Sequence, residues 1–460
     1  MTSLRARLAW ARPDPASRIE APDASLGLCA LATASGLGHS APTLAGRSVL
    51  VRTARQIGAA QGLLELDGLA RRLVLCPPDL AAEHLPYVLR TAEVEAIVTD
   101  VADPALEALG VPVHRLTAPC TPVPGAAVAE GESEWLLFTS GTTGVPKLVA
   151  HSLAALTGAI APAVPAGERP VWATFYDIRR YGGLQVLLRA LTGGCALALC
   201  DPDEPLPDQL GRLARFGVTH MSGTPSHWRR LLMGGQPGAF RPGYVRLSGE
   251  IADQPVLDGL RSLFPHTRIV HAYASTEAGV VFEVDDGREG FPADFLDRPG
   301  PIEMKLADGS LRVRSPGTST RYVGPDAGPL FDADGFVDTG DIVEVREGRC
   351  RFAGRRNGVI NVGGLKVHPE EVEAVINRHP AVRISMVRAR ANPITGAVVT
   401  ADVALVDPEA AASPEGNSDL RASILAMCRS ALPPHKAPAA IRFVPELRMT
   451  AGGKLDRSHA

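Results

Sequence analysis

The sequence has neither a surplus of one charge nor cysteines in pairs. Among 460 residues, 47 lysines and arginines stand against 50 aspartates and glutamates, a formal net charge of −3. This balance argues against a nucleic-acid-binding surface and against a polybasic membrane surface. The seven cysteines are scattered and form no Cys-x-x-Cys pair, so neither a disulfide framework nor a zinc site is indicated. We therefore expect a protein of the reducing cytoplasm that binds no nucleic acid.

Long apolar segments are also scarce. Residues 1–17 contain arginines but no apolar stretch of the kind that a signal peptide needs. Residues 24–37 are too short and too rich in small side chains to span a bilayer. The sequence has no internal repeats or long disordered tracts, and residues 410–418 are the segment most suited to a flexible loop. We expect no membrane span, and either a monomer or a homodimer.

The chain does have apolar material for more than one core, since 45% of its residues are hydrophobic. In the first part of the chain, short apolar runs typical of buried strands occupy residues 48–51, 73–76 and 96–99. Helical patterns follow such runs or stand between them, at residues 56–70, 80–92 and 151–160. This alternation indicates an α/β domain with a largely parallel sheet.

The last third of the chain has a different character. Residues 300–345 carry short alternating segments separated by Gly and Asp, which predict a small β-rich subdomain. The remainder, about 100 residues, has the size of an ordinary domain. Its first helix begins at Pro369, and acids that the helix dipole favours stand in the first turn: Glu370, Glu371 and Glu373. We expect a large N-terminal domain over residues 1–356, made of α/β subdomains and the β-rich one, and a small mobile α+β domain over residues 357–460.

One polar segment follows a buried strand directly. After the apolar run 135–138 come four hydroxyl side chains, two glycines and one lysine within nine residues: Thr139, Ser140, Gly141, Thr142, Thr143, Gly144, Val145, Pro146 and Lys147. Small residues let the backbone turn tightly and bring N–H groups and hydroxyls close to a ligand. A triphosphate suits such a loop, and a polar surface turn is the plain alternative. The spacing differs from the P-loop pattern, in which Gly-Lys-Ser/Thr opens a helix.

Two further motifs combine carboxylates with small or aromatic residues. In residues 271–279, Tyr273 can stack on a base, Thr276 can bond a phosphate, and Glu277 can hold Mg²⁺ through oxygen. Core packing for Tyr273 and a surface position for Glu277 are the alternatives. In the run Asp338-Thr-Gly-Asp341, the acids can accept hydrogen bonds from ribose hydroxyls, although such a run is usually only a β-turn.

Two motifs lie near the C-terminus. In residues 354–369, Arg355 can pin ribose or phosphate, and the glycines permit close backbone approach or hinge motion; a plain linker between domains is compatible with both. The run Gly452-Gly453-Lys454 would ordinarily be a frayed tail.

Together, and in this order, the five motifs resemble those of the adenylate-forming superfamily: acyl- and aryl-CoA synthetases, peptide-synthetase adenylation domains and luciferases. The resemblance covers roughly residues 46–457, and the run 360–373 is most similar to benzoate and chlorobenzoate CoA ligases. It implies a reaction in two steps. A carboxylate attacks the α-phosphate of Mg-ATP, giving an acyl adenylate and pyrophosphate. The thiol of CoA, or alternatively of a carrier-protein phosphopantetheine, then takes the acyl group and releases AMP.

The resemblance also implies roles for particular residues. Lys454 would bridge the carboxylate and α-phosphate oxygens, an electrostatic role between two anions. Thr276 would contact the α-phosphate, and Glu277 would hold the metal. The small domain would rotate at a hinge at Asn357 between the two steps. The nucleotide would be held by Thr139, Ser140, Gly141, Thr142, Thr143, Gly144, Lys147, Ser248, Gly249, Glu250, Ala272, Tyr273, Ser275, Asp341 and Arg355, and a pantetheine tunnel would pass Gly363 and Gly364.

Three features depart from the family pattern. Asn357 stands where an aspartate is usual at the hinge, and Arg448 stands where a proline often precedes the terminal lysine motif. The first motif begins at Phe138, which makes the N-terminal subdomain short. None of these changes removes a residue that carries the chemistry. At the hinge, Asn tolerates the backbone conformations that the motion needs.

The acid is expected to lie beside the segment 175–183. Many members of the superfamily have an aromatic–His pair there, whereas this chain has Tyr176-Asp177 followed by Arg179-Arg180. Buried charges in an apolar pocket would pair with each other or with polar groups of the substrate. A hydroxylated aryl acid or a functionalised acyl chain is the hypothesis, held by Tyr176, Asp177 and Arg180, with room left by Gly182 and Gly183. An ion pair at the rim between Asp177 and the arginines is the alternative.

Other functions are less favoured. A non-catalytic nucleotide-binding scaffold is disfavoured because Lys454, Glu277, Asp341 and Arg355 are all present. An oxygenase of the luciferase type is compatible with the motifs, though nothing requires it. The sequence does not decide between CoA and an acyl carrier protein, because a basic patch at Arg378, Arg383 and Arg388 would suit either partner.

Overall fold

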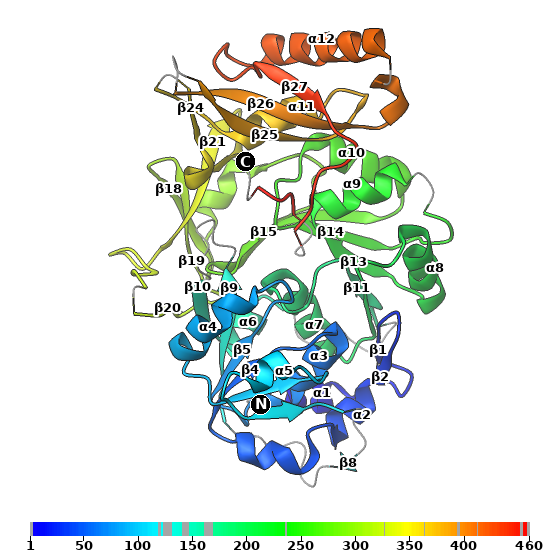
Figure 1. The fold of residues 1–460 in the computed structure, drawn as a ribbon, viewed down its shortest axis with the longest axis vertical. Coiled ribbons are helices and arrows are strands. Elements are labelled where there is room, and N and C mark those ends of the chain that lie inside the picture. Colours follow the sequence, from blue (N-terminus) through cyan, green and yellow to red (C-terminus); the bar gives the residue numbers. More distant parts are fainter. Residues whose placement is uncertain are drawn as a thin grey trace.

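The computed structural model describes residues 3–117, 121–122, 131–139, 147–160, 169–234, 237–325, 327–362, 364–392, 396–411, 413–450 and 454–457. Figure 1 shows a large domain built of sheets with helices packed on them, and a small domain at one end that carries the C-terminal elements. The predicted fold class, a mixed α/β large domain with a β-rich part and a small C-terminal α+β domain, is confirmed. No helix in the described part of the chain has both the length and the apolar character that crossing a bilayer requires.

An eight-stranded sheet in the order β16-β15-β14-β13-β11-β12-β1-β2 forms the first layer. Its strands are β1 (Arg18–Glu20), β2 (Ser25–Gly27), β11 (Trp172–Thr174), β12 (Leu197–Leu199), β13 (His220–Gly223), β14 (Tyr244–Ser248), β15 (Arg268–Ser275) and β16 (Gly279–Val284). The central pairs are parallel, and the edge strands β2 and β16 are antiparallel to their neighbours. The carboxyl ends of β13, β14 and β15 therefore meet at one edge.

A seven-stranded sheet in the order β20-β10-β9-β5-β4-β6-β7 forms the second layer. Its strands are β4 (Ser48–Val51), β5 (Arg72–Leu75), β6 (Ala96–Thr99), β7 (Val113–Arg115), β9 (Glu134–Thr139), β10 (Lys147–Ser152) and β20 (Arg321–Val323). A two-stranded sheet joins β3 (Ala34–Ser35) to β8 (Thr121–Pro122). The predicted parallel alternation holds from β9 through β7, and β10 and β20 extend the sheet in antiparallel fashion.

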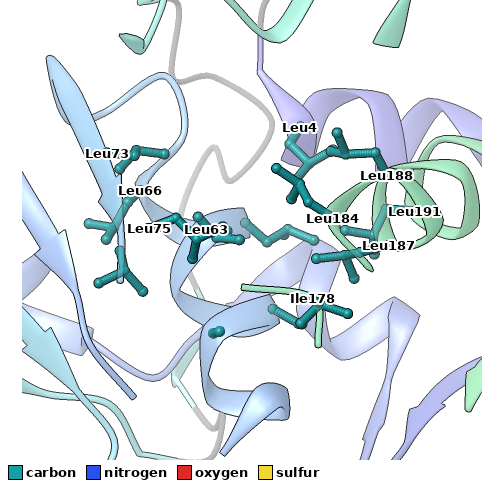
Figure 2. Close-up of a cluster of buried hydrophobic side chains, with 14 of the residues drawn as sticks. Leu4, Leu63, Leu66, Leu73, Leu75, Ile178, Leu184, Leu187, Leu188 and Leu191 are labelled. Atoms are coloured by element: carbon teal, nitrogen blue, oxygen red, sulfur yellow. The ribbon is translucent and has the colours of Figure 1, made fainter. Parts of the chain in front are cut away.

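Helices cover and separate these sheets. They are α1 (Leu4–Ala11), α2 (Leu28–Thr33), α3 (Gln56–Leu66), α4 (Leu85–Thr91), α5 (Pro104–Glu107), α6 (Leu153–Thr157), α7 (Tyr181–Gly193), α8 (Leu206–Phe216), α9 (Pro225–Met233) and α10 (Gln254–Leu263), with 3₁₀ turns η1 (Gly38–Leu44), η2 (Ala82–His84) and η3 (Ala293–Asp297). Helices α3 and α7 share one core with strands of both sheets, and Figure 2 shows their leucines facing one another. Leu63, Leu187 and Leu191 are fully buried there.

The third sheet and the small domain complete the chain. The sheet runs in the order β17-β22-β21-β19-β18, with β17 (Phe291–Pro292), β18 (Glu303–Ala307), β19 (Ser310–Arg314), β21 (Val337–Arg346) and β22 (Arg349–Arg355). The small domain contains η4 (Arg356–Gly358), β23 (Ile360–Val362), β24 (Leu365–Val367), α11 (Pro369–Ile376), β25 (Val382–Asn392), β26 (Gly396–Leu405), η5 (Pro408–Ala411), α12 (Pro414–Ala431) and β27 (Ala440–Phe443). Its own apolar cluster packs α11 and α12 on the strands.

Three local predictions differ from the structure. The helix expected over residues 151–160 is present but shorter, as α6, because β10 pairs with β9 up to Ser152, which caps the helix. Of the flexible loop expected over residues 410–418, residues 410–411 end η5 and residues 414–418 begin α12, whose N-cap Ser413 accepts a hydrogen bond from the Gly416 N–H. Glu373 does not serve the helix dipole in the first turn of α11; it is buried and lies 2.6 Å from Arg457.

Candidate active site

The carboxyl ends of two neighbouring parallel strands, β14 and β15, carry one group of the predicted nucleotide residues. Ser248, Gly249 and Glu250 follow β14, and the register pairs Ser248 with Ala272 on β15. Ligands of open α/β sheets bind at this end of the strands. Ser275 closes β15 and its Oγ accepts a hydrogen bond from the Ala278 N–H at 2.9 Å, so this serine shapes the turn into β16.

Tyr273 lies within β15, since that strand continues two residues beyond it. Its ring stacks on Phe282 and Phe352, with centroids 5.5 and 5.0 Å away. Its hydroxyl donates a hydrogen bond of 2.5 Å to Asp341 Oδ2. Burial, together with the neighbouring carboxylate, raises the pKa of Tyr273 well above its usual value. The ring therefore packs in the β-rich core, and the hydroxyl positions Asp341.

Asp341 and Arg355 form a pair across β21 and β22. They are opposite one another in the antiparallel register, and Arg355 Nε lies 3.0 Å from Asp341 Oδ1. The backbone of Gly340 has φ +70°, a left-handed conformation that glycine adopts without strain. Each oxygen of Asp341 thus has one donor, from Tyr273 or from Arg355. A carboxylate has about four acceptor positions, so lone pairs remain for the hydroxyls of a ligand.

Lys454 reaches this site from the small domain. A Cβ on Gly249 would lie 3.4 Å from Lys454 Cε, and the Leu455 N–H donates to Glu250 Oε1 at 3.2 Å. The other oxygen of Glu250 accepts from the Ser226 N–H at the start of α9. Figure 1 shows the C-terminal segment running down from β27 to the ends of β14 and β15. Glu250 therefore ties the last residues of the chain to the large domain.

The charge of Lys454 lies among charges of both signs. Burial lowers the pKa of Lys454, the Glu250 carboxylate opposes this, and Arg355 and Arg180 reinforce it. A half-buried ammonium with two guanidinium groups nearby is stabilised by an anionic ligand. The arrangement suits a site where negatively charged groups meet.

Glu277 provides a carboxylate at the same place. Burial raises its pKa, while Arg355 lowers it and Asp341 raises it. The described residues contain no group of three or more His, Cys, Asp or Glu that could hold a metal ion by themselves. Mg²⁺ is typically held by one or two carboxylates together with substrate phosphates, not by a protein cage. Glu277 fits that kind of site, because a cation would stabilise the charged form that burial disfavours.

His151 is a residue that the sequence reasoning missed. It ends the buried part of β10, and its Nε2 lies 2.8 Å from the carbonyl oxygen of Thr276. Burial lowers the pKa of His151 to about 4, so the imidazole is neutral at pH 7 and donates from Nε2. It therefore anchors the backbone of Thr276. The sequence could have pointed to His151, because this histidine ends the apolar strand that directly follows the first polar motif.

The charges predicted for the acid pocket are paired within the protein. Asp177 Oδ2 lies 2.6 Å from Arg179 Nη2, and Arg179 also donates to the carbonyl of Thr53 at 2.7 Å. Arg180 pairs with Asp79. The alternative of an ion pair therefore holds for Asp177 and Arg179, since a carboxylate and a guanidinium this deeply buried satisfy one another, whereas Arg180 pairs with a different acid.

The other residues predicted for the pocket also make internal contacts. The hydroxyl of Tyr176 donates to the carbonyl of Ser248 at 2.8 Å and accepts from its N–H at 3.1 Å. A Cβ on Gly183 would meet the Asp177 carbonyl at 2.2 Å, so this glycine allows close backbone packing and leaves no room for a ligand. A Cβ on Gly182 would lie 3.5 Å from the ring of Tyr176.

A cavity of about 130 Å³ opens between the two domains beside this segment. Phe175 stacks on His227 in its wall, with centroids 5.2 Å apart. Burial lowers the pKa of His227 to about 4. The lining is partly apolar and includes residues of the large domain (Phe175, Asp177, His227 and Met233) and of the small domain (Ile384, Leu447 and Met449).

The remaining predicted residues lie away from these strand ends, or outside the part of the chain that the structure describes. Thr139 and Lys147 are register partners at the ends of β9 and β10, and Lys147 is exposed. The Gly364 N–H donates to Asn361 Oδ1 at 2.9 Å. Asn357 belongs to η4. Part of the first loop and of the tunnel lies outside the described residues, namely Ser140, Gly141, Thr142, Thr143, Gly144 and Gly363.

Comparison with known proteins agrees with this arrangement. Residues 52–322 match the model of the AMP-binding enzyme family, and residues 371–454 match that of the AMP-binding enzyme C-terminal domain. The chain belongs to the AMP-binding enzyme family. The resemblance to the adenylate-forming superfamily is thereby confirmed. The two matched regions correspond to the large domain, up to β20, and to the small domain with Lys454.

Among curated relatives of this AMP-binding enzyme, an isonitrile lipopeptide synthase of Streptomyces coeruleorubidus is 27% identical over 83% of this chain. The match spans only 27% of that much longer relative. The mitochondrial acyl-coenzyme A synthetase ACSM5 of Mus musculus is 27% identical over 82% of this chain and 73% of its own length.

Solved structures share the fold over nearly the whole chain. The anthranilate CoA ligase AuaEII in complex with anthranoyl-AMP has a TM-score of 0.81 and 19% identity, over 98% of this chain and 95% of that one. The o-succinylbenzoate CoA synthetase of Bacillus subtilis in complex with ATP and magnesium ion has a TM-score of 0.75 and 20% identity, over 99% and 98%. These identities are low, so the likeness concerns the fold.

Proposed function

We propose that this AMP-binding enzyme is an ATP-dependent acid–thiol ligase. It adenylates an aryl or acyl carboxylic acid, releases pyrophosphate, and transfers the acyl group to the thiol of CoA with release of AMP. The observation that carries the proposal is the position of Lys454: the small domain brings its half-buried side chain beside Gly249. A scaffold that only binds a nucleotide would have no need for a cation carried there by a second domain.

The residues of the site divide the work of the first step. Lys454 draws the acid carboxylate and the α-phosphate together, because a positioned cation stabilises two anions that must meet. Asp341, held by Tyr273 and Arg355, accepts hydrogen bonds from the ribose hydroxyls. His151 fixes the carbonyl of Thr276, which directs that threonine toward the α-phosphate. Mg²⁺, where bound, neutralises phosphate charge, and Glu277 would hold it.

The second step requires that Lys454 leave. The thiol must reach the acyl carbon from the side that the small domain covers, so we propose that residues 357–460 rotate as a unit about η4, with Asn357 as the hinge. Among the described residues, polar contacts between the two domains include the Leu455 N–H with Glu250, and Arg378 Nη2 at 3.7 Å from Glu289 Oε1. A polar interface of this kind suits a domain that moves, since interfaces between domains of one chain resemble transient ones.

The thiol acceptor is CoA in the leading proposal. The relative with the greater coverage of its own length, the mitochondrial acyl-coenzyme A synthetase, supports CoA. A carrier-protein phosphopantetheine is the second candidate, and the match to part of an isonitrile lipopeptide synthase supports it. Both thiols end in the same pantetheine arm, so the site itself serves either.

One experiment tests the function and the acceptor together. Pyrophosphate release is measured with ATP, Mg²⁺ and a panel of aryl and alkyl acids, and the products with CoA and with a holo carrier protein are then identified by mass spectrometry. An acyl-CoA mass with at least one acid is expected. An acyl mass on the carrier alone selects the second candidate, and the absence of pyrophosphate release with every acid rejects the adenylating function.

A further inference from the structure

Two neighbouring buried donors in the large domain lack partners. Arg246 on β14 is 5% exposed, and its Nη2 has no hydrogen-bond partner among the described residues. Ser222 on β13 is 1% exposed, and its Oγ is likewise without a partner in the described part of the chain. The two are Cα partners in the parallel register, so their side chains lie side by side on one face. Buried polar atoms are nearly always hydrogen-bonded, so this pair indicates a missing acceptor.

The face that carries them packs toward α7. Val245 and Leu247, on either side of Arg246, belong to the core under α8, α9 and α10, so Arg246 points to the opposite face. The charge of Arg246 acts there on Tyr181 and Arg189 of α7. The donors thus lie between the first sheet and the buried helix that opens at the acid segment.

Positive charge is in excess at this place. Arg246 Nε lies 3.0 Å from Glu283 Oε1 without forming an aligned hydrogen bond, and the Glu283 side chain is 37% exposed. Arg189 Nε also lacks a partner among the described residues, and burial, then the charge of Arg246, lowers the pKa of Arg189. One exposed carboxylate therefore faces a buried guanidinium group, Arg246, and a partly buried one, Arg189. An anionic or strongly accepting group would offset the cost of burying them.

Arg246 lies about as far from the Lys454 side of the site as a ring or a short carbon chain would reach. Arg246 precedes Ser248 by two residues on the same strand, a rise of about 7 Å. Gly249 comes next, and Lys454 lies against it. Tyr176 spans the interval: its hydroxyl bonds to Ser248, and the charge of Arg246 acts on it. A carboxylate at Lys454 would leave the far end of the acid near Arg246.

We propose that Arg246 and Ser222 bind a second oxygen acceptor at the far end of the acid. The substrate is then an aryl or short-chain carboxylic acid with a carboxylate or a phenolic hydroxyl opposite the reacting carboxyl group. This inference rests on the proposed function, because it concerns the acid of the same site. The sequence predicted that Asp177 and Arg180 bind the polar group of the acid, but their charges are already paired within the protein. The inference assigns that binding to Arg246 and Ser222.

Matched acids test the inference through pyrophosphate release. The pairs are 4-hydroxybenzoate against benzoate, terephthalate against 4-methylbenzoate, and adipate against hexanoate. A hydrogen bond to a charged group is worth about 10- to 150-fold, so wild type should prefer the acceptor-bearing acid of at least one pair by that factor in kcat/KM. Arg246→Met should bring the ratio to within about 3-fold of unity, and Ser222→Ala should lower it by about 3- to 10-fold.

The control is Arg268→Met, which removes an exposed arginine of β15 paired with Asp285 and should leave the ratio unchanged. If Arg246→Met does not fold, Ser222→Ala carries the test alone. Wild type without a preference in any pair, or an Arg246→Met enzyme that keeps the preference, overturns the inference while leaving the ligase function intact. A complete lack of pyrophosphate release overturns both.

Discussion

The hydrogen bond from Tyr273 to Asp341 allows a substitution that changes one atom. Tyr273→Phe removes the hydroxyl but keeps the ring between Phe282 and Phe352. The lost bond is 2.5 Å long and its acceptor is a carboxylate whose side chain is 13% exposed. Hydrogen bonds to charged groups contribute about 1.5–3 kcal/mol. Because Asp341 keeps Arg355, we expect a loss in the lower half of that range, about 1.5–2 kcal/mol in the free energy of unfolding.

The same change should also weaken nucleotide binding. Without Tyr273, Asp341 keeps one of the two donors that orient it, so its lone pairs are less well placed for the ribose. We expect KM for ATP to rise by about 5- to 20-fold, with kcat changed much less, since uniform binding of the nucleotide is what is lost.

Urea denaturation and pyrophosphate release at varied ATP give the two numbers. Tyr87→Phe is the matched control, because Tyr87 is half-buried and its hydroxyl has no hydrogen bond to the described residues. The reasoning is refuted if Tyr273→Phe matches Tyr87→Phe in both stability and KM.

Two further predictions concern the acid segment and the buried histidines. Asp177→Ala leaves Arg179 buried without its carboxylate partner and should lower the free energy of unfolding by about 3–5 kcal/mol in urea denaturation. Glu303→Ala, which breaks an exposed pair with Arg314, is the control and should lower it by less than about 1 kcal/mol. Equal losses would mean that the buried pair is not formed. His151 and His227 have a pKa of about 4 in the folded chain against 6.5 for an ordinary histidine, so their contribution is complete above pH 6.5 and is lost as pH falls toward 4. As the pH falls from 6.5 to 4, each of the two histidines should lower the free energy of unfolding by up to about 3 kcal/mol. In urea titrations, a His227→Gln variant should therefore lose less free energy of unfolding than wild type between pH 7 and pH 4.5.

The residues of the candidate site were easier to predict from the sequence than the hydrogen bonds that position them. Lys454, Asp341 and Arg355 were singled out by the resemblance to the adenylate-forming superfamily, and the structure brings them to one site. The sequence carried no sign of the bonds that position them, because Tyr273 and Asp341 are 68 residues apart and Leu455 and Glu250 are 205 apart. Such pairings follow from how the sheets and the small domain pack.

The direction in which buried side chains point decides the contacts of the acid segment. The charges of Asp177, Arg179 and Arg180 are plain in the sequence, but whether they face a ligand or each other depends on neighbouring backbone. Arg179 turns to the carbonyls of Thr53 and Ala54, which belong to the other α/β layer. Ser222 and Arg246 carried no motif at all, and only the strand register places them together.

The central claim is that Lys454 serves the first step and leaves before the second. Lys454→Ala is measured in two assays, pyrophosphate exchange for adenylation and thioester formation from preformed acyl adenylate and CoA. Lys436→Ala, which removes a small-domain lysine paired with Glu371, is the control. Loss of one preorganised electrostatic group costs about 10²- to 10³-fold, so adenylation should fall by that factor while thioester formation changes by less than about 3-fold. Equal losses in both assays would contradict the account.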